Sequence, residues 1–116
     1  MRESNEIAGY HAHVYFDLPQ REVAERLREA ISVRFSVEMG SLHEKAIGPH
    51  PKPMYQVAFA PDEFAKIVPW LMLNRSGLSI LVHPRTGDEQ ADHDVNPLWL
   101  GERLPIDLEF LRKHAG

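Results

Sequence analysis

The hydrophobic and polar positions alternate in a way that predicts strands and helices in turn. Residues 9–17 alternate apolar and polar side chains, which is typical of a half-buried strand. The same reasoning predicts further strands around residues 35–39, 54–60 and 78–83. Helices are expected to begin at Pro19 and Pro61, because a proline is tolerated in the first turn of a helix.

Each predicted helix has an apolar stripe with helical spacing. The stripe of the first helix comprises Val23, Leu27, Ala30 and Ile31, and that of the second comprises Phe64, Ile67, Val68, Leu71 and Met72. Pro69 lies inside the second helix and is expected to kink or split it. Residues 84–97 have the composition of a polar, acidic loop, and residues 98–116 that of a tail with some helical pattern.

The order strand, helix, strand, strand, helix, strand predicts an α+β fold, a ferredoxin-like βαββαβ sandwich. Its four-stranded antiparallel sheet would have the spatial order 4-1-3-2, with two helices on one face. The tail, the long loops or a second subunit must then cover the other face. We expect a single domain over residues 1–116, with residues 1–7 as a flexible tail.

Composition narrows the possible chemistry. The 116 residues carry a formal net charge of −4 and no long basic run, so nucleic acid is a poor candidate partner. No apolar stretch approaches the ~20 residues of a membrane span, and residues 1–6 lack the apolar segment of a signal peptide, so we expect a cytoplasmic protein. The absence of cysteine excludes disulfides, zinc–thiolate sites and a cysteine nucleophile, so any metal must be held by His, Asp or Glu.

Three of the seven histidines are predicted to converge on one face of the sheet. In the first strand His11, His13 and Tyr15 share a face with Asp17, while the apolar alternate positions face the helices. The fourth strand runs antiparallel beside the first, so its end at His83 falls next to His11. Two histidines on one strand face with a third from a neighbouring element form a candidate metal site.

The other histidines have different expected positions. His50 lies in the stiff connection Gly48–Pro53, toward the Tyr15 end of the first strand, and His93 lies in the acidic loop. His43 is expected at a sheet edge and His114 in the tail, both solvated.

Three segments in this order resemble the DOPA 4,5-dioxygenase family. They are residues 10–17 (YHAHVYFD), 48–51 (GPHP) and 82–89 (VHPRTGDE), the last followed by Asp92 and His93. The resemblance covers roughly residues 9–112. It implies a ferredoxin-like fold, often dimeric, and extradiol cleavage of a catechol ring by O2 with non-haem Fe(II).

The resemblance also suggests roles for the candidate residues. His11, His13 and His83 would bind the metal, which in a purified sample could be another divalent ion such as zinc. His50 and His93 would move protons, while Tyr15 and Arg85 would contact a catechol such as DOPA. The alternative of two histidines with one carboxylate stays open. The candidate carboxylates are Asp17, Asp88, Glu89 and Asp92.

Two other functions are compatible with the same residues. One is a non-catalytic module of this fold that binds a small aromatic compound or a metal. The other is a different histidine-based metalloenzyme, such as a zinc or manganese hydrolase. A purely structural dimerisation domain is a third alternative, against which the clustered histidines argue. The fold alone does not separate these functions.

Overall fold

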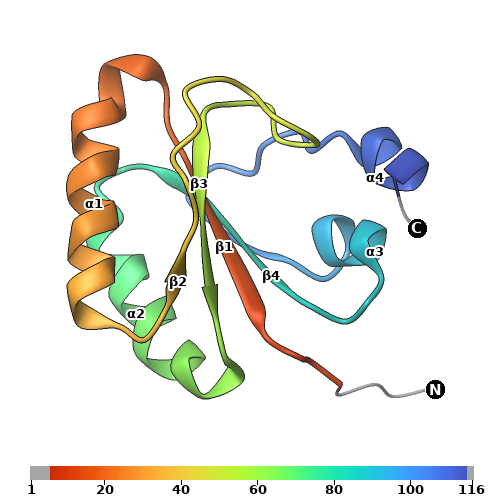
Figure 1. Ribbon diagram of the computed structural model, residues 1–116, viewed down its shortest axis with the longest axis horizontal. Coiled ribbons are helices and arrows are strands. Elements are labelled where there is room, and N and C mark those ends of the chain that lie inside the picture. Colours follow the sequence, from red (N-terminus) through yellow and green to blue (C-terminus); the bar gives the residue numbers. More distant parts are fainter. Residues whose placement is uncertain (1–5, 115–116) are drawn as a thin grey trace.

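The computed structural model describes residues 6–114 of the chain. In this part of the chain five strands form one antiparallel sheet, in the order β2-β3-β1-β4-β5. Figure 1 shows the sheet between two groups of helices. The strands are β1 (Tyr10–Tyr15), β2 (Glu38–Met39), β3 (Met54–Phe59), β4 (Ser79–Pro84) and β5 (Leu98–Leu100). Most of the predicted flexible tail, residues 1–5, lies outside the described residues.

The sheet confirms the predicted neighbours of the first strand and adds a strand that was not predicted. β1 lies between β3 and β4, so the predicted order 4-1-3-2 is found within the five-stranded order. A sheet of only four strands was therefore wrong. The fifth strand has three residues between Pro97 and Gly101 and pairs with β4, and a segment that short carries almost no alternation.

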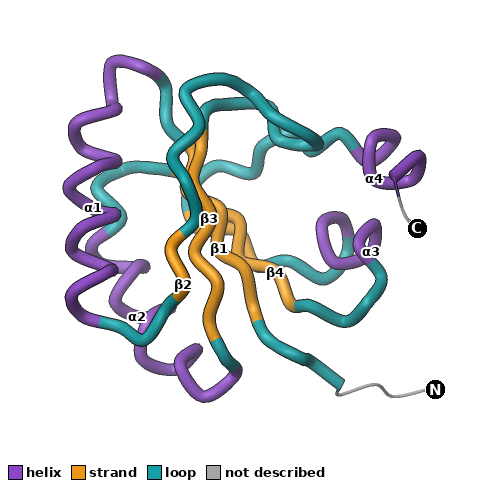
Figure 2. The backbone as a smooth tube through the Cα atoms, in the orientation of Figure 1, coloured by secondary structure: helices purple, strands orange, loops and turns teal. Residues whose placement is uncertain are grey.

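Two helices cover one face of the sheet, as predicted. They are α1 (Arg21–Arg34) and α2 (Phe64–Asn74), each preceded by a short 3-10 turn, η1 (Leu18–Gln20) and η2 (Pro61–Glu63). Figure 2 shows both helices on the same side of the strands. The core between them includes Ala12, Val14 and Phe16, the apolar face of the first strand.

The apolar stripes of the helices differ in detail from the prediction. Ala24 is buried in α1 and Val23 is exposed, because helix α1 is rotated slightly relative to the stripe that the sequence spacing suggested. Met72 at the end of α2 is also exposed. Pro69 does not split α2, since its exposed ring lies on the solvent side of a continuous helix.

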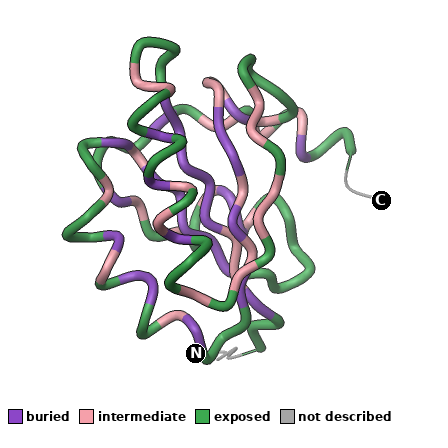
Figure 3. The backbone as a smooth tube through the Cα atoms, turned by 60° about the vertical axis from the view of Figure 1, so that its left-hand side comes forward, coloured by how far each residue is buried: buried purple, intermediate pink, exposed green. Residues whose placement is uncertain are grey.

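The second face is covered by the C-terminal third of the chain. The predicted loop over residues 84–97 contains helix α3 (Glu89–Asp94), and the tail contains helix α4 (Leu108–His114). The extended segment before α4 places Leu104 in a small buried cluster with Tyr15, Met54 and Leu81. Figure 3 shows that the buried residues are concentrated in the strands, which therefore have cover on both faces.

No helix within residues 6–114 has both the length and the apolar character needed to cross a lipid bilayer.

Candidate functional site

The centre of the site is a cluster of histidines that strand pairing brings together. His11 on β1 lies directly opposite His83 on β4, as the predicted antiparallel pairing required. His13 lies two residues further along β1 on the same face and is 2% exposed. These three histidines each offer a nitrogen atom within 4.8 Å of the others. The predicted convergence of His11, His13 and His83 is present in the structure.

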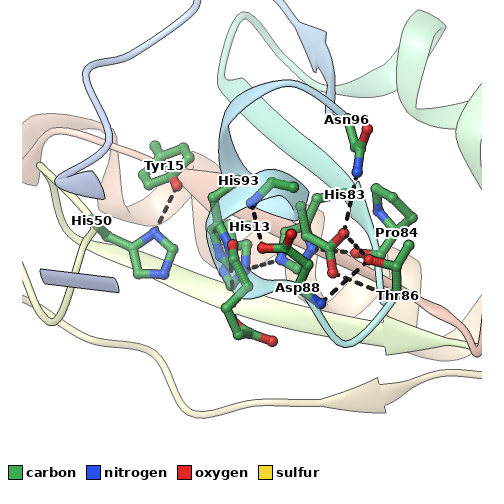
Figure 4. A network of polar contacts seen from close by, with 12 residues as sticks. His13, Tyr15, His50, His83, Pro84, Thr86, Asp88, His93 and Asn96 are labelled. Atoms are coloured by element: carbon green, nitrogen blue, oxygen red, sulfur yellow. Dashed lines mark hydrogen bonds and ion pairs between the residues drawn. The ribbon is translucent and has the colours of Figure 1, made fainter. Parts of the chain in front are cut away.

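Hydrogen bonds fix which nitrogen of His83 is free. Its Nδ1 lies 2.9 Å from the carbonyl oxygen of Pro84, which can only accept, so Nδ1 carries the proton. The Nε2 atom of His83 therefore has a lone pair and lies 3.1 Å from Nε2 of His13. Figure 4 shows this contact in the middle of the site.

A short helix and a loop bring further histidines to the cluster. His93 is buried on α3, where its Nδ1 donates to the carbonyl of Glu89 at 2.7 Å, which leaves its Nε2 with a lone pair. His50 is buried in the proline-rich connection, with its ring 4.3 Å from that of His13. His13, His50 and His93 form a second group whose nitrogens lie within 4.8 Å of one another. His13 belongs to both groups.

The donor set suits a metal ion. The 3.1 Å between Nε2 of His13 and Nε2 of His83 matches two nitrogen ligands that lie about 2.1 Å from one ion. The Nδ1 atom of His13 is buried and has no hydrogen-bond partner among the described residues. A buried nitrogen without a hydrogen-bond partner destabilises the fold. A bound cation would change which nitrogen of His13 carries the proton and so change the hydrogen bonds of this ring. Imidazole nitrogens suit iron, zinc and copper.

Burial keeps His11, His13, His50 and His83 neutral at pH 7. It lowers the pKa of His11 and of His50 to about 4, with smaller contributions from Arg85 and His93 at His11 and from His93 and His43 at His50. It lowers the pKa of His83 to about 3, with His93 contributing further. For His13, burial and then the neighbouring imidazoles hold the pKa well below its ordinary value. Neutral imidazoles are the form that binds metals.

Four of the clustered histidines, His11, His13, His50 and His93, line a cavity of about 410 Å³, and His83 lies behind them, outside its lining. This volume is within the usual range for small-molecule sites. Glu89 is the only carboxylate among the residues that line it, and Phe110 stacks on His114 at its edge. The lining comprises His11, His13, Pro49, His50, Gln56, Glu89, His93, Phe110, Leu111 and His114.

The candidate carboxylates have other partners, and both three-residue groups found within residues 6–114 consist of histidines alone. Asp92 is fully buried and accepts hydrogen bonds from the backbone and the hydroxyl of Thr86. Asp88 caps α3, and Asp17 is exposed beside Lys52. Glu89 faces the cavity with an exposed side chain.

The remaining predicted residues lie at different distances from the cavity. Tyr15 is only 1% exposed, and its hydroxyl lies 2.7 Å from Nδ1 of His50. Arg85 is exposed and lines neighbouring hollows with Ala8, but it is not part of the lining of the histidine cavity. It lies near enough to His11 to lower the pKa of that ring.

The sequence did not point to several lining residues. His114 was expected to be an ordinary surface residue, and the structure places it at the cavity. Gln56 lies opposite His13 in the β1–β3 pairing, so its place follows from the register. Gln56 could have been found from its position in the third predicted strand. No pattern in the sequence predicts the packing of α4, which brings His114 to the cavity.

Comparison with known proteins shows to which family the chain is related. The model of the Dopa 4,5-dioxygenase family matches residues 10–110, which include all five clustered histidines. The chain belongs to this family. A DOPA 4,5-dioxygenase from Amanita muscaria is 32% identical over 116 residues, and an uncharacterised 21.2 kDa protein from Botryotinia fuckeliana is 37% identical over 117 residues.

Members of the Dopa 4,5-dioxygenase family differ in length. The alignments include 92% and 90% of this chain, but only 51% of the Amanita protein and 63% of the Botryotinia protein. A Nostoc punctiforme PCC 73102 protein of known crystal structure, provisionally described as a dioxygenase, is 59% identical. The two folds superpose with a TM-score of 0.94 over 97% of this chain and 98% of the other.

Proposed function

We propose that this protein is a non-haem Fe(II) extradiol dioxygenase that cleaves the ring of DOPA or a related catechol. The observation that carries the proposal is the cluster of histidines beside a cavity, in a chain of the Dopa 4,5-dioxygenase family. His11, His13 and His83 would hold the metal, with no protein carboxylate. When bound, Fe(II) would hold both catechol oxygens and O2 together and pass electron density between them.

The residues around the metal group have roles in this proposal that follow from their hydrogen bonds. The Nε2 lone pair of His93 can accept a proton from a catechol hydroxyl, because its Nδ1–H is held by the carbonyl of Glu89. His50, on the other side of His13, is the second candidate for hydrogen bonding or proton transfer. Phe110 and Leu111 give the cavity an apolar wall for the ring.

The charge of the cavity favours a substrate with an amino group. The carboxylate of Glu89 would pair with an ammonium group such as that of DOPA. Arg85 lies outside the cavity lining, on the side of His11, and would pair with a substrate carboxylate that extends out of the cavity. Tyr15 is too deeply buried to contact the substrate.

We also propose that the protein forms a homodimer. Strand β5 is an edge of the sheet, where unpaired backbone groups can pair with another chain. Two apolar side chains near this edge, Val95 and Leu98, are exposed by 76% and 39%.

The test of the function is oxygen uptake by protein reconstituted anaerobically with Fe(II). On addition of DOPA and then of simpler catechols, we expect one O2 to be consumed per ring and a coloured, ring-opened product. Protein shown to retain iron that consumes no O2 with any catechol would contradict the proposal. That result would favour a binding module or a hydrolase, which aromatic-ligand binding and hydrolase assays with Zn(II)- or Mn(II)-loaded protein would then distinguish.

A further inference from the structure

One contact in the site has no role in the proposal above. The hydroxyl of Tyr15 lies 2.7 Å from Nδ1 of His50, which comes from a different part of the chain. Figure 4 shows the Tyr15 hydroxyl directed at one ring nitrogen of His50, with the other nitrogen on the opposite edge of the ring. Tyr15 is 1% exposed and His50 is 8% exposed, so water does not compete freely for this bond.

The direction of this hydrogen bond follows from its surroundings. Within residues 6–114 the Tyr15 hydroxyl has His50 as its only hydrogen-bond partner, and a phenol, whose ordinary pKa is about 10, keeps its proton at pH 7. If Nδ1 of His50 carried a proton, the hydroxyl proton of Tyr15 would be buried without an acceptor, which is costly. The Tyr15 O–H therefore donates to Nδ1 of His50, and the proton of this neutral ring is on Nε2.

This tautomer is opposite to those of the neighbouring histidines. His83 and His93 each donate from Nδ1 to a backbone carbonyl and so present a lone pair at Nε2. His50 presents an N–H group at the same atom, in a cavity wall shared with His13 and His93. His50 thus presents a donor at Nε2, where His83 and His93 present acceptors.

The backbone holds His50 in place for this role. Pro49 and Pro51 restrict the chain on both sides, and the carbonyl of Pro49 accepts a hydrogen bond of 2.8 Å from the backbone of Asp107. The amide of His50 donates to the carbonyl of Ile47 at 3.0 Å. Tyr15 itself is fixed by stacking on Trp99, with ring centroids 6.0 Å apart.

We propose that Tyr15 is a positioning residue that fixes His50 in the Nε2–H tautomer. His50 then donates a hydrogen bond to an anionic oxygen of the deprotonated catechol. This inference rests on the proposed function for the identity of that oxygen. It also removes His50 from the possible metal ligands, since neither of its nitrogens then has a free lone pair, and so favours His11, His13 and His83 over the group that contains His50.

The first test compares two buried tyrosines. Tyr15→Phe removes the hydroxyl that bonds His50, and the control Tyr55→Phe removes a buried hydroxyl that donates to the carbonyl of Ala24 on the helix side of the sheet. Proteins with 15N-labelled histidine, metal-free and loaded with Zn(II), would be examined by two-bond 1H–15N NMR correlation, which distinguishes the tautomers. We expect Nε2–H at His50 in the parent protein and in Tyr55→Phe, and a mixture of tautomers in Tyr15→Phe.

The same variants, loaded with Fe(II), separate positioning from a structural role. In Tyr15→Phe we expect kcat to fall about tenfold with little change in KM, a fraction of the roughly 10²-fold loss when a preorganised donor is removed outright. A His50 ring with its proton on Nδ1 in the parent protein, or a tautomer unchanged by Tyr15→Phe, would overturn the inference. The NMR result stands even if no catechol is turned over, so the failure of the proposed function would be recognised separately.

A second pair of variants does not depend on the packing of Tyr15. His50→Gln keeps an N–H donor near the Nε2 position, whereas His50→Glu offers acceptors at pH 7. His50→Gln should bind Zn(II) with the affinity of the parent protein to within about threefold, since we assign no ligand to His50. Catechol cleavage should be at least about tenfold faster in His50→Gln than in His50→Glu. Loss of Zn(II) from His50→Gln, or equal rates in the two variants, would contradict the assignment.

Discussion

His13 is the residue on which the whole site depends. It is common to both groups of histidines that could hold a metal, and its ring is in contact distance of four other imidazoles. Its place on the sheet was predictable, because strict alternation in β1 put His11 and His13 on the face opposite Ala12 and Val14. The choice of nitrogen atoms was not predictable, since it depends on carbonyl groups such as that of Pro84, which only the folded backbone positions.

The first prediction concerns metal binding. In His13→Ala we expect the affinity for Fe(II) or Zn(II) to fall by more than the about 10–100-fold that loss of an outer-shell partner costs. His43→Ala is the control, because His43 is absent from both groups of histidines. Metal content after dialysis against a weak chelator, with circular dichroism to check the fold, measures both. Stoichiometric metal in His13→Ala would contradict the site assignment.

The second prediction concerns substrate selection by Glu89. Glu89→Gln removes the only carboxylate among the cavity-lining residues and should raise KM for DOPA by about three- to tenfold, the scale of a partly exposed ion pair. For a catechol with no amino group, such as 3,4-dihydroxyphenylpropionate, KM should stay the same or fall. Steady-state oxygen uptake with both substrates measures the difference. An equal rise in both KM values would show that Glu89 does not recognise an ammonium group.

At the scale of secondary structure, prediction succeeded for long elements and failed for short ones. Helices α1 and α2 and strands β1, β3 and β4 follow clear periodicities. Helix α3 has six residues rich in acids, and its stability comes from its contacts rather than from an apolar stripe. The position of His93 therefore could be predicted only as a loop residue, although it lies on a helix.

The third prediction concerns how α3 is anchored. Asp92 is fully buried, and its carboxylate accepts bonds of 2.8 Å and 2.6 Å from Thr86. In Asp92→Ala these donors lose their acceptor, so the free energy of unfolding should fall by about 2–4 kcal/mol. Asp94→Ala, on the same helix, removes only a loose exposed pair with Arg103 and should cost less than about 1 kcal/mol. Urea denaturation measures both, and similar losses would refute the anchoring role.

At the scale of the whole molecule, the second face of the sheet is covered by segments of the same chain. The tail segment and helices α3 and α4 cover the face that the predicted four-stranded sheet left bare. The choice between the tail, the loops and a second subunit could not be made from the sequence, because Leu104 and Ile106 belong to no periodic pattern. Cover from a partner is therefore not needed there, and any dimer would use another surface, such as the β5 edge.

The fourth prediction concerns acid stability of the metal-free protein. The histidines have lower pKa values in the folded chain, about 4 for His11 and His50 and about 3 for His83, than the roughly 6.5 of the unfolded chain. As the pH falls below 6.5, the unfolded chain binds protons that the folded chain does not, so the free energy of unfolding decreases toward pH 4. We expect a loss of at least about 2 kcal/mol over this range, allowing for solvent screening. Urea titrations at several pH values that show a constant free energy would be inconsistent with a buried, neutral cluster.

The fifth prediction concerns oligomeric state. Sedimentation equilibrium should give a dimer at micromolar concentration, and Leu98→Asp should weaken it at least about tenfold by placing a charge at the β5 edge. Val33→Asp, on the exposed side of α1, is the matched control and should leave the dimer intact. A monomer at all concentrations would rule out the dimer.

The position of His114 has a practical consequence for the design of expression vectors. This residue lines the cavity and lies two positions before the last residue of the sequence. A polyhistidine purification handle attached within a few residues of His114 would therefore supply mobile imidazoles beside the cavity that compete for the same ions. Metal stoichiometry, affinity and histidine NMR spectra should accordingly be recorded on protein from which every such handle has been removed.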